Sequence, residues 1–205
     1  MNRVERMKKN PFLSEVSSLI GQRYPEDCDA VLVSAWVRFE ALCAENADET
    51  TAVQMHTRSR IYPAIAVFES LIAVGTSRED AAQLILDFYM TRAQKPAKAI
   101  QNLLKVPGLY KAVPKIFLIG VNKMFGSDAG FMAKYYEAEK GCFRMDMLEC
   151  PYMSICEKYS CPEIVRAFCA SDDVAYGNMH PKLIWGRTKT LGRGDECCDF
   201  KLTVK

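Results

Sequence analysis

The sequence predicts an α+β fold, in which a helical N-terminal part packs with a C-terminal antiparallel sheet and its helices. Two observations predict it. Apolar residues recur at helical spacing over residues 1–140, whereas from Phe143 they alternate with polar residues, the period of a strand with one buried face. Helices followed by strands are typical of α+β proteins. We therefore expect a helical region over residues 1–140 and a cysteine-rich α+β region over residues 141–205, in one compact unit.

Composition restricts the class of protein and its partners. Of the 205 residues, 49% are hydrophobic and 25% are charged, which is typical of a globular protein. The net charge of +2 argues against a nucleic-acid partner. Residues Met1–Asn10 lack the apolar core of a signal peptide, and the most apolar stretch, Ile61–Gly75, is shorter than the roughly 20 residues that cross a bilayer. We expect a cytoplasmic protein without a membrane partner; a homo-oligomer is left open.

The first two predicted helices cover Pro11–Gln22 and Glu26–Asn46. In the second, apolar residues form two adjoining stripes, and a helix that is apolar over so wide an arc is expected to be mostly buried. Cys28 and Cys43 lie on this helix and are interpreted as small core residues, since free cysteine is often buried.

A long helix is predicted over Thr50–Val74, with a kink or junction at Pro63. His56 and Arg60 are four residues apart and share a face of this helix. They form either a solvated basic turn or a pair that points into the functional site and holds an anion.

The next helix is predicted to begin at the capping box Ser77–Asp80. We expect Pro96 to end it or to begin another helix, and Pro107–Gly108 to end that one. A further helix is expected over Leu109–Lys123, with an interruption near Pro114.

Strands appear only in the last third of the sequence. Alternating apolar residues over 143–147 predict a strand, and Pro151–Tyr159 predicts a short helix. Pro162 is suited to the first position of another helix. The segments Lys182–Leu191 and Cys198–Val204 favour two strands joined by a glycine turn, and so predict a hairpin.

Nine cysteines are present, most of them from Cys142 onward. An odd number of cysteines in a reducing compartment favours free thiols or metal ligands over disulfides. Zinc sites usually contain closely spaced ligand pairs, and no CxxC pair occurs between Cys150 and Cys169. No metal site is therefore assigned, although a structural zinc ion is left open.

Cys169 and Asp172 lie on one side of the helix that Pro162 is predicted to begin. A nearby carboxylate raises the pKa of a thiol, so a nucleophilic Cys169 would need a cation such as Arg187 or His56. The alternative is that Cys169 is buried and Asp172 makes a hydrogen bond at the helix end.

On the last strand, Cys198 faces the core, whereas Cys197 and Asp199 point the other way, so one of the two thiols is expected to leave the core side. Arg187 is expected in the middle of the neighbouring strand. It is either solvated or salt-bridged, or it forms a planar fork beside Asp199 that suits a substrate carboxylate.

Short motifs recur around these residues. They are Cys150-Pro151-Tyr152, Cys161-Pro162-Glu163, Phe168-Cys169 with Asp172-Asp173, Arg187-Thr188-Lys189-Thr190-Leu191 and Cys198-Asp199-Phe200. At these motifs the chain resembles the L-2-amino-thiazoline-4-carboxylic acid hydrolase family. The resemblance extends upstream to Arg60–Ala66 and covers the chain from about Thr50 to the end. The C-terminal hairpin is also similar to the end of 4-vinyl reductase type domains.

The resemblance implies hydrolysis of a small-molecule substrate, a cyclic isothiourea, to N-carbamoyl-cysteine. A cysteine nucleophile would divide the reaction into two easier steps, and a carboxylate would pair with the amidine and move protons. No cofactor is implied, although a metal-activated water is left open. The implied residues are Cys169 or Cys198 as nucleophile, Asp172 and Asp199 as acid/base or amidine partners, and Arg187, Arg60, His56 and Thr188 as substrate-binding groups.

Two alternatives come from other classes of protein. A non-catalytic domain that binds a small ligand or responds to a metal would capture its ligand without product, since one fold serves many functions. A redox sensor that uses Cys197 and Cys198 would be oxidised by mild peroxide.

Overall fold

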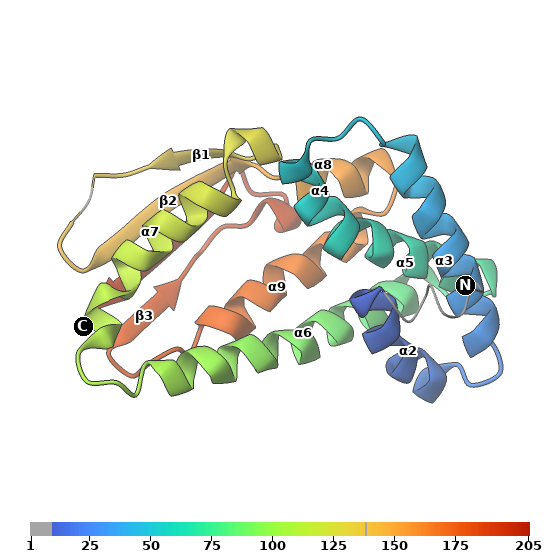
Figure 1. Cartoon of the computed structure of the whole chain (residues 1–205), viewed down its shortest axis with the longest axis horizontal. Helices are drawn as coiled ribbons and strands as arrows, with labels where there is room; N and C mark the ends of the chain where they lie inside the picture. Colours follow the sequence, from blue (N-terminus) through green and yellow to red (C-terminus); the bar gives the residue numbers. More distant parts are fainter. Residues whose placement is uncertain (1–9, 138) are drawn as a thin grey trace. The chain divides into compact units, whose positions relative to one another are not determined.

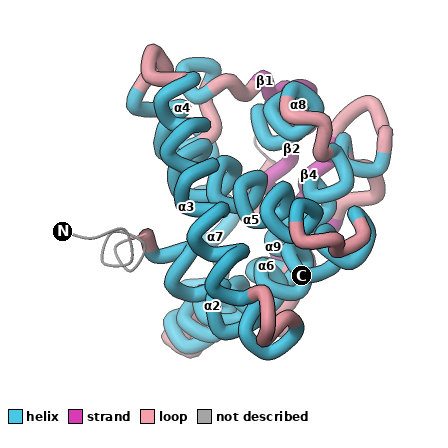
Figure 2. Tube along the Cα trace, turned by 90° about the vertical axis from the view of Figure 1, so that its right-hand side faces the viewer, coloured by secondary structure: helices cyan, strands magenta, loops and turns pink. Residues whose placement is uncertain are grey.

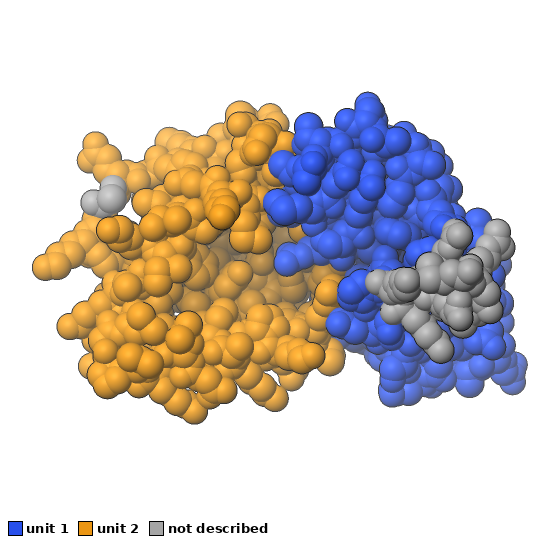
Figure 3. Space-filling view, in the orientation of Figure 1, with its two compact units in different colours: residues 1–88, 155–164 blue, residues 89–154, 165–205 orange. Residues whose placement is uncertain are grey.

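The computed structural model describes residues 10–137 and 139–205 and has the predicted α+β fold (Figure 1). Contacts divide the chain into unit 1, residues 1–88 and 155–164, and unit 2, residues 89–154 and 165–205 (Figure 3). The predicted boundary at residue 140 and the single compact unit stay predictions. Among the described residues, no helix combines the length and the apolar character that crossing a membrane requires.

Unit 1 is built from helices. α3 packs against α2 and α5, and this contact buries Leu32 and Trp36. Val33 and Val37 are 39% and 42% exposed, so the prediction that α3 is mostly buried is wrong: its neighbours cover one side only. The helices are α2 (Pro11–Arg23), α3 (Cys28–Glu45), α4 (Thr51–His56), α5 (Tyr62–Ala73) and the first part of α6 (Arg78–Leu103).

A π-helical segment, Thr57–Ile61, interrupts the long helix predicted before Pro63. The N–H of Tyr62 bonds to the carbonyl of Thr57, five residues earlier. Pro63 has no N–H to continue the α-helical ladder, so the register changes here and α5 begins anew. The predicted junction at Pro63 is confirmed.

α6 begins as predicted and ends differently. The Oγ of Ser77 accepts a hydrogen bond from the N–H of Asp80 (3.1 Å) and donates one to its carboxylate (2.6 Å), which confirms the cap. The prediction that Pro96 breaks the helix is wrong, since α6 continues to Leu103. Pro96 is exposed while Ala93 and Ala97 beside it are buried, so packing on one side maintains the helix where water can solvate the unpaired carbonyl.

Unit 2 contains the sheet, whose strands pair antiparallel in the order β1-β2-β4-β3. Figure 2 shows strand segments in magenta, with β1, β2 and β4 labelled. The predicted hairpin is confirmed, but its first strand ends at Gly186, so the residues up to Leu191 lie outside it. The first strand of the sheet was not predicted. The elements are α7 (Val113–Met124), β1 (Met132–Tyr135), β2 (Cys142–Glu149), α8 (Pro151–Lys158), α9 (Val165–Tyr176), β3 (Leu183–Gly186) and β4 (Cys198–Val204), with α8 shared between the units.

One face of the sheet is covered by α7 and α9. Phe117 of α7 and Tyr176 of α9 both pack on Trp185 of β3. Met147 pairs with Cys198 in the β2–β4 register, and both are buried. Cys198 therefore lies on the covered face, and alternation places the next residue on the opposite face.

Replacing Ser77 by alanine should lower the free energy of unfolding by about 1 kcal/mol, because the first turn of α6 loses its cap. Chemical denaturation followed by circular dichroism measures the change. The matched control is S154A, an exposed serine within α8, which should change the value by less than about 0.5 kcal/mol. Equal losses in both variants would contradict the capping role.

Candidate functional site

Three thiols of unit 2 interact around one turn of the chain. Cys150 precedes α8, Cys169 lies in α9 and Cys198 begins β4. The N–H of Leu191 donates to the Sγ of Cys198 (3.2 Å), and the N–H of Gly192 interacts with the thiol of Cys169. We call Cys150, Cys169 and Cys198 the thiol cluster. Consecutive amides thus face two sulfur atoms, an arrangement that favours negative charge on sulfur.

Glycine at position 192 permits this close approach. A Cβ atom there would lie 3.1 Å from the Sγ of Cys169 and 3.0 Å from the Cγ1 of Val165. Both distances are shorter than ordinary contacts, so a larger residue would push the turn away from α9. The turn then closes at Gly194, whose φ of +88° favours glycine.

Arg187 follows β3 and is buried beside the thiol cluster, with its side chain 5% exposed. One guanidinium nitrogen, Nη2, donates to the carbonyl of Cys169 and to Asp173 (2.7 Å). The other, Nη1, lies 3.9 Å from Asp172 and has no hydrogen-bond partner among the described residues. A buried N–H without a partner is costly, and a bound anion would satisfy it.

Burial dominates the electrostatics of the three thiols. It raises the pKa of Cys150 to about 12 and that of Cys169 to about 11, and it also raises the pKa of Cys198. The positive charge of Arg187 opposes this rise at Cys169 and Cys198. The resting thiols are therefore protonated at neutral pH, and a reaction at sulfur needs a group that takes the proton.

Asp199 lies on the opposite face of the sheet from Cys198, as alternation along β4 requires. It accepts hydrogen bonds from the N–H and Oγ1 of Thr188 (2.7 and 2.6 Å) and the N–H of Lys189 (2.6 Å). Burial acts to raise its pKa, but these bonds prevail and hold the pKa below its usual value. Asp199 and Thr188 thus hold the turn after β3. The acid/base role of Asp199 and the substrate contact of Thr188 stay predictions.

Arg187 was expected to form a planar fork beside Asp199, but its guanidinium donates a hydrogen bond to Asp173 instead. Arg187 was expected in mid-strand, but β3 ends one residue earlier, so the register of the hairpin does not fix its side chain. Sequence reasoning missed Asp173, Cys150 and Gly192 as parts of this site. Cys150 and Asp173 belong to the motifs named above and Gly192 to the predicted turn, but no sequence pattern indicates that they lie beside Cys169 and Cys198.

His56 and Arg60 belong to unit 1, whereas the thiol cluster belongs to unit 2. His56 ends α4 and is 4% exposed, whereas Arg60 is exposed in the π-helical segment. The wider π turn alters the four-residue spacing that predicted a shared face. Their role as anion clamp with Arg187 stays a prediction.

The remaining cysteines are also free thiols. Cys197 is buried at 6% exposure, but it leaves the side of the core on which Cys198 lies, as expected. Its charge interactions are with Asp146 and Glu196, away from the thiol cluster. Over residues 10–137 and 139–205, no group of three or more His, Cys, Asp or Glu has the geometry to hold a metal ion. A zinc ion stays an untested alternative.

Comparison with known proteins gives one match. The family model described as L-2-amino-thiazoline-4-carboxylic acid hydrolase matches residues 54–202, which include the π-helical segment, the thiol cluster and Arg187. No curated protein and no solved structure matches the chain. The similarity to 4-vinyl reductase type domains stays a prediction.

Alkylation of Cys169 should be slow at pH 7 and should increase up to pH 10 or beyond, because the thiolate forms only near its raised pKa of about 11. In R187Q the profile should shift to still higher pH, since the charge that stabilises the thiolate is lost. Peptide mass spectrometry after iodoacetamide treatment measures both.

Two variants control this experiment. R187K keeps the charge and should retain most of the wild-type profile, which separates the electrostatic effect from loss of structure. R193Q removes an exposed cation of the same turn and should leave the profile unchanged. If alkylation of Cys169 depended on pH in R187Q as it does in R193Q, Arg187 would not stabilise the thiolate.

Proposed function

The chain belongs to the L-2-amino-thiazoline-4-carboxylic acid hydrolase family, and from this membership we propose that it opens the ring of a cyclic isothiourea to give N-carbamoyl-cysteine. One observation carries the proposal. The thiols of Cys169 and Cys198 lie by consecutive backbone amides, beside a buried Arg187 that keeps one nitrogen without a hydrogen-bond partner among the described residues. This combination offers a nucleophile and a site for a carboxylate.

The proposed chemistry proceeds in two displacements at one carbon, which lies between the ring sulfur and two nitrogens. A cysteine thiolate attacks this carbon, and the bond to the ring sulfur breaks, so that the ring sulfur leaves as a thiolate. Water then attacks the same carbon, and the cysteine leaves. The oxygen of the water becomes the carbamoyl oxygen, and the protein returns to its starting state.

Asp172 is the proposed proton carrier for this reaction. It lies three residues from Cys169 in α9, close to one helical turn, and its side chain is 40% exposed. Its carboxylate takes the proton of the attacking thiol and returns it to the departing ring sulfur. The amides of Leu191 and Gly192 stabilise the thiolates formed on the way.

Arg187 is the proposed anion site. A carboxylate on the ring accepts hydrogen bonds from its Nη1, so that the buried guanidinium gains the hydrogen-bond partner it lacks among the described residues. This contact orients the ring so that its reactive carbon faces the sulfur atoms. The second candidate function, ligand binding without turnover, is favoured by the protonated state of the resting thiols.

Substitution of Cys169 or Cys198 by serine should reduce ring opening at least a hundredfold for the residue that is the nucleophile, because a serine hydroxyl is the weaker nucleophile. Mass spectrometry of N-carbamoyl-cysteine after incubation with L-2-amino-thiazoline-4-carboxylate measures turnover. Trapping of a protein adduct on one of the two thiols would identify which one attacks.

C197S is the matched control, since it removes the adjacent thiol that lies away from the thiol cluster, and it should keep full turnover. A parallel incubation with a chelator tests metal-activated water. Full turnover in both C169S and C198S would exclude the thiol mechanism. Ligand capture with no product in wild type would favour the binding domain.

Replacement of Arg187 by glutamine should lower kcat/KM about ten- to a hundredfold for the carboxylated ring, since hydrogen bonds to charged groups contribute about 1.5–3 kcal/mol. For 2-amino-thiazoline without the carboxylate, the loss should be much smaller, because the contact does not form with that substrate. R193Q serves as the control and should keep the wild-type preference for the carboxylated ring. If R187Q still discriminates between the two rings as wild type does, Arg187 is not the anion site.

A further inference from the structure

Unit 2 also contains a segment whose charged residues are all basic. Between Asp87 and Asp128 the chain contains seven Lys and Arg and no acidic residue. The rest of the chain carries twenty Lys and Arg against twenty-five Asp and Glu. The net charge of +2 therefore conceals a strongly basic segment in a chain that is otherwise acidic, and such a segment attracts anions.

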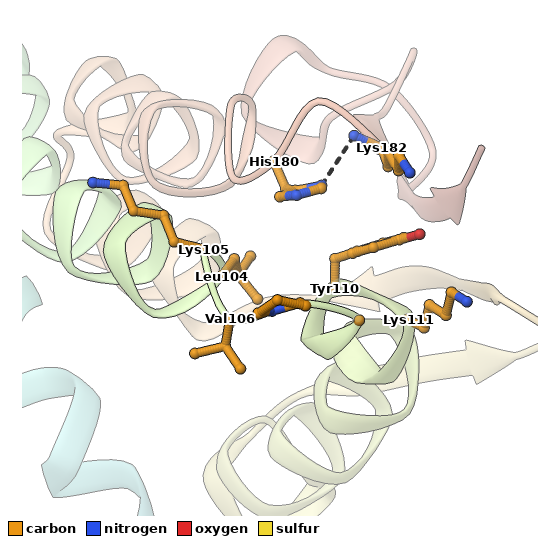
Figure 4. A pocket seen from close by; sticks show the side chains of 9 residues that line it. Leu104, Lys105, Val106, Tyr110, Lys111, His180 and Lys182 are labelled. Atoms are coloured by element: carbon orange, nitrogen blue, oxygen red, sulfur yellow. Dashed lines mark hydrogen bonds between the residues drawn. The ribbon is translucent and has the colours of Figure 1, made fainter.

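This basic segment borders a cavity of about 300 Å³, a volume suited to a small ligand (Figure 4). Its wall also includes the loop before β3, so two parts of the chain distant in sequence form it. The Nε2 of Gln101 donates to the carbonyl of Asn178 (2.9 Å), which ties these parts together. The lining residues are Leu104, Lys105, Val106, Pro107, Gly108, Tyr110, Lys111, His180 and Lys182.

An aromatic pair gives the cavity one fixed wall. The rings of Tyr110 and His180 are stacked, with centroids 4.6 Å apart and planes 6° apart. The backbone N–H of Lys182 donates to Nδ1 of His180 (3.1 Å), so the neutral ring carries its proton on Nε2. Nε2 of His180 is therefore a hydrogen-bond donor in a defined orientation.

Three lysines supply the charge of the cavity. The ammonium of Lys182 lies 5.5 Å from the centre of the Tyr110 ring, and that of Lys105 donates to Asn102 (2.8 Å). Lys111 extends from the turn before α7. Within the described part of the chain, the lining contains neither an acidic residue nor an arginine. The ammonium group of lysine binds phosphate as a compact point charge.

We propose that this cavity binds a small molecule that carries a phosphate group, in a site formed by Lys111, Lys182 and Nε2 of His180, with Lys105 extending away from them at the rim (Figure 4). Leu104 and Val106 provide an apolar wall for the rest of that molecule. The site uses none of the residues proposed for ring opening. The protein therefore has a second ligand besides its substrate, and this ligand is recognised by its phosphate group.

Titration with inorganic pyrophosphate at constant ionic strength tests the proposal, with the histidine ring protons observed by nuclear magnetic resonance. The chain has two histidines, His56 and His180, and H180N assigns their signals. The His180 signal should shift with saturation, whereas the His56 signal in unit 1 should not. In the double variant K111Q/K182Q, binding should weaken about tenfold or more, because two charged contacts are lost.

K123Q is the matched control, since Lys123 belongs to the same basic segment but does not line the cavity, and it should bind as wild type does. Sodium chloride added to the same ionic strength should give no saturable shift. A saturable shift that K111Q/K182Q retains, a response to citrate stronger than that to pyrophosphate, or no response to pyrophosphate would overturn the proposal. The ring-opening assay is independent of each of these results.

Discussion

The burial of the Arg187 guanidinium is the interaction on which the candidate site depends. The side chain is 5% exposed, and Asp173 and the carbonyl of Cys169 supply hydrogen-bond acceptors for its Nη2. Both acceptors belong to α9, so Arg187 connects that helix to the segment that follows β3. Its stacking over Phe200 adds β4 to the same contact. Arg187 thus links the helix that carries Cys169 to the strand that carries Cys198.

Much of this arrangement follows from sequence periodicity. The helical spacing of Cys169 and Asp172 predicts that both lie on one side of a helix, and alternation predicts that Cys198 lies on the covered face of the sheet. These rules work because both elements are regular where the thiols lie. The same alternation assigns Asp199 to the other face, which already separates it from the thiol of its neighbour.

Periodicity fails where regular structure stops. β3 ends at Gly186, and Arg187 to Leu191 follow a path set by hydrogen bonds to Asp199, which no spacing rule describes. The approach of Gly192 to α9 depends on a contact between residues distant in sequence. The π turn before Pro63 is a further case, because a single missing N–H decides between a kink and a change of register.

The electrostatics of the thiol cluster favour a ligand that carries both a negative and a positive group. Burial raises the pKa of Cys169 and Cys198, and the charge of Arg187 opposes that rise. A carboxylate bound to Arg187 would cancel part of this charge, so an anion alone would make the thiols harder to ionise. A cationic amidine held next to the sulfur atoms would restore the positive charge and make its own carbon more electrophilic. In the proposed mechanism, a ring that bears both groups would therefore activate the site, whereas a ligand with the carboxylate alone would inhibit it.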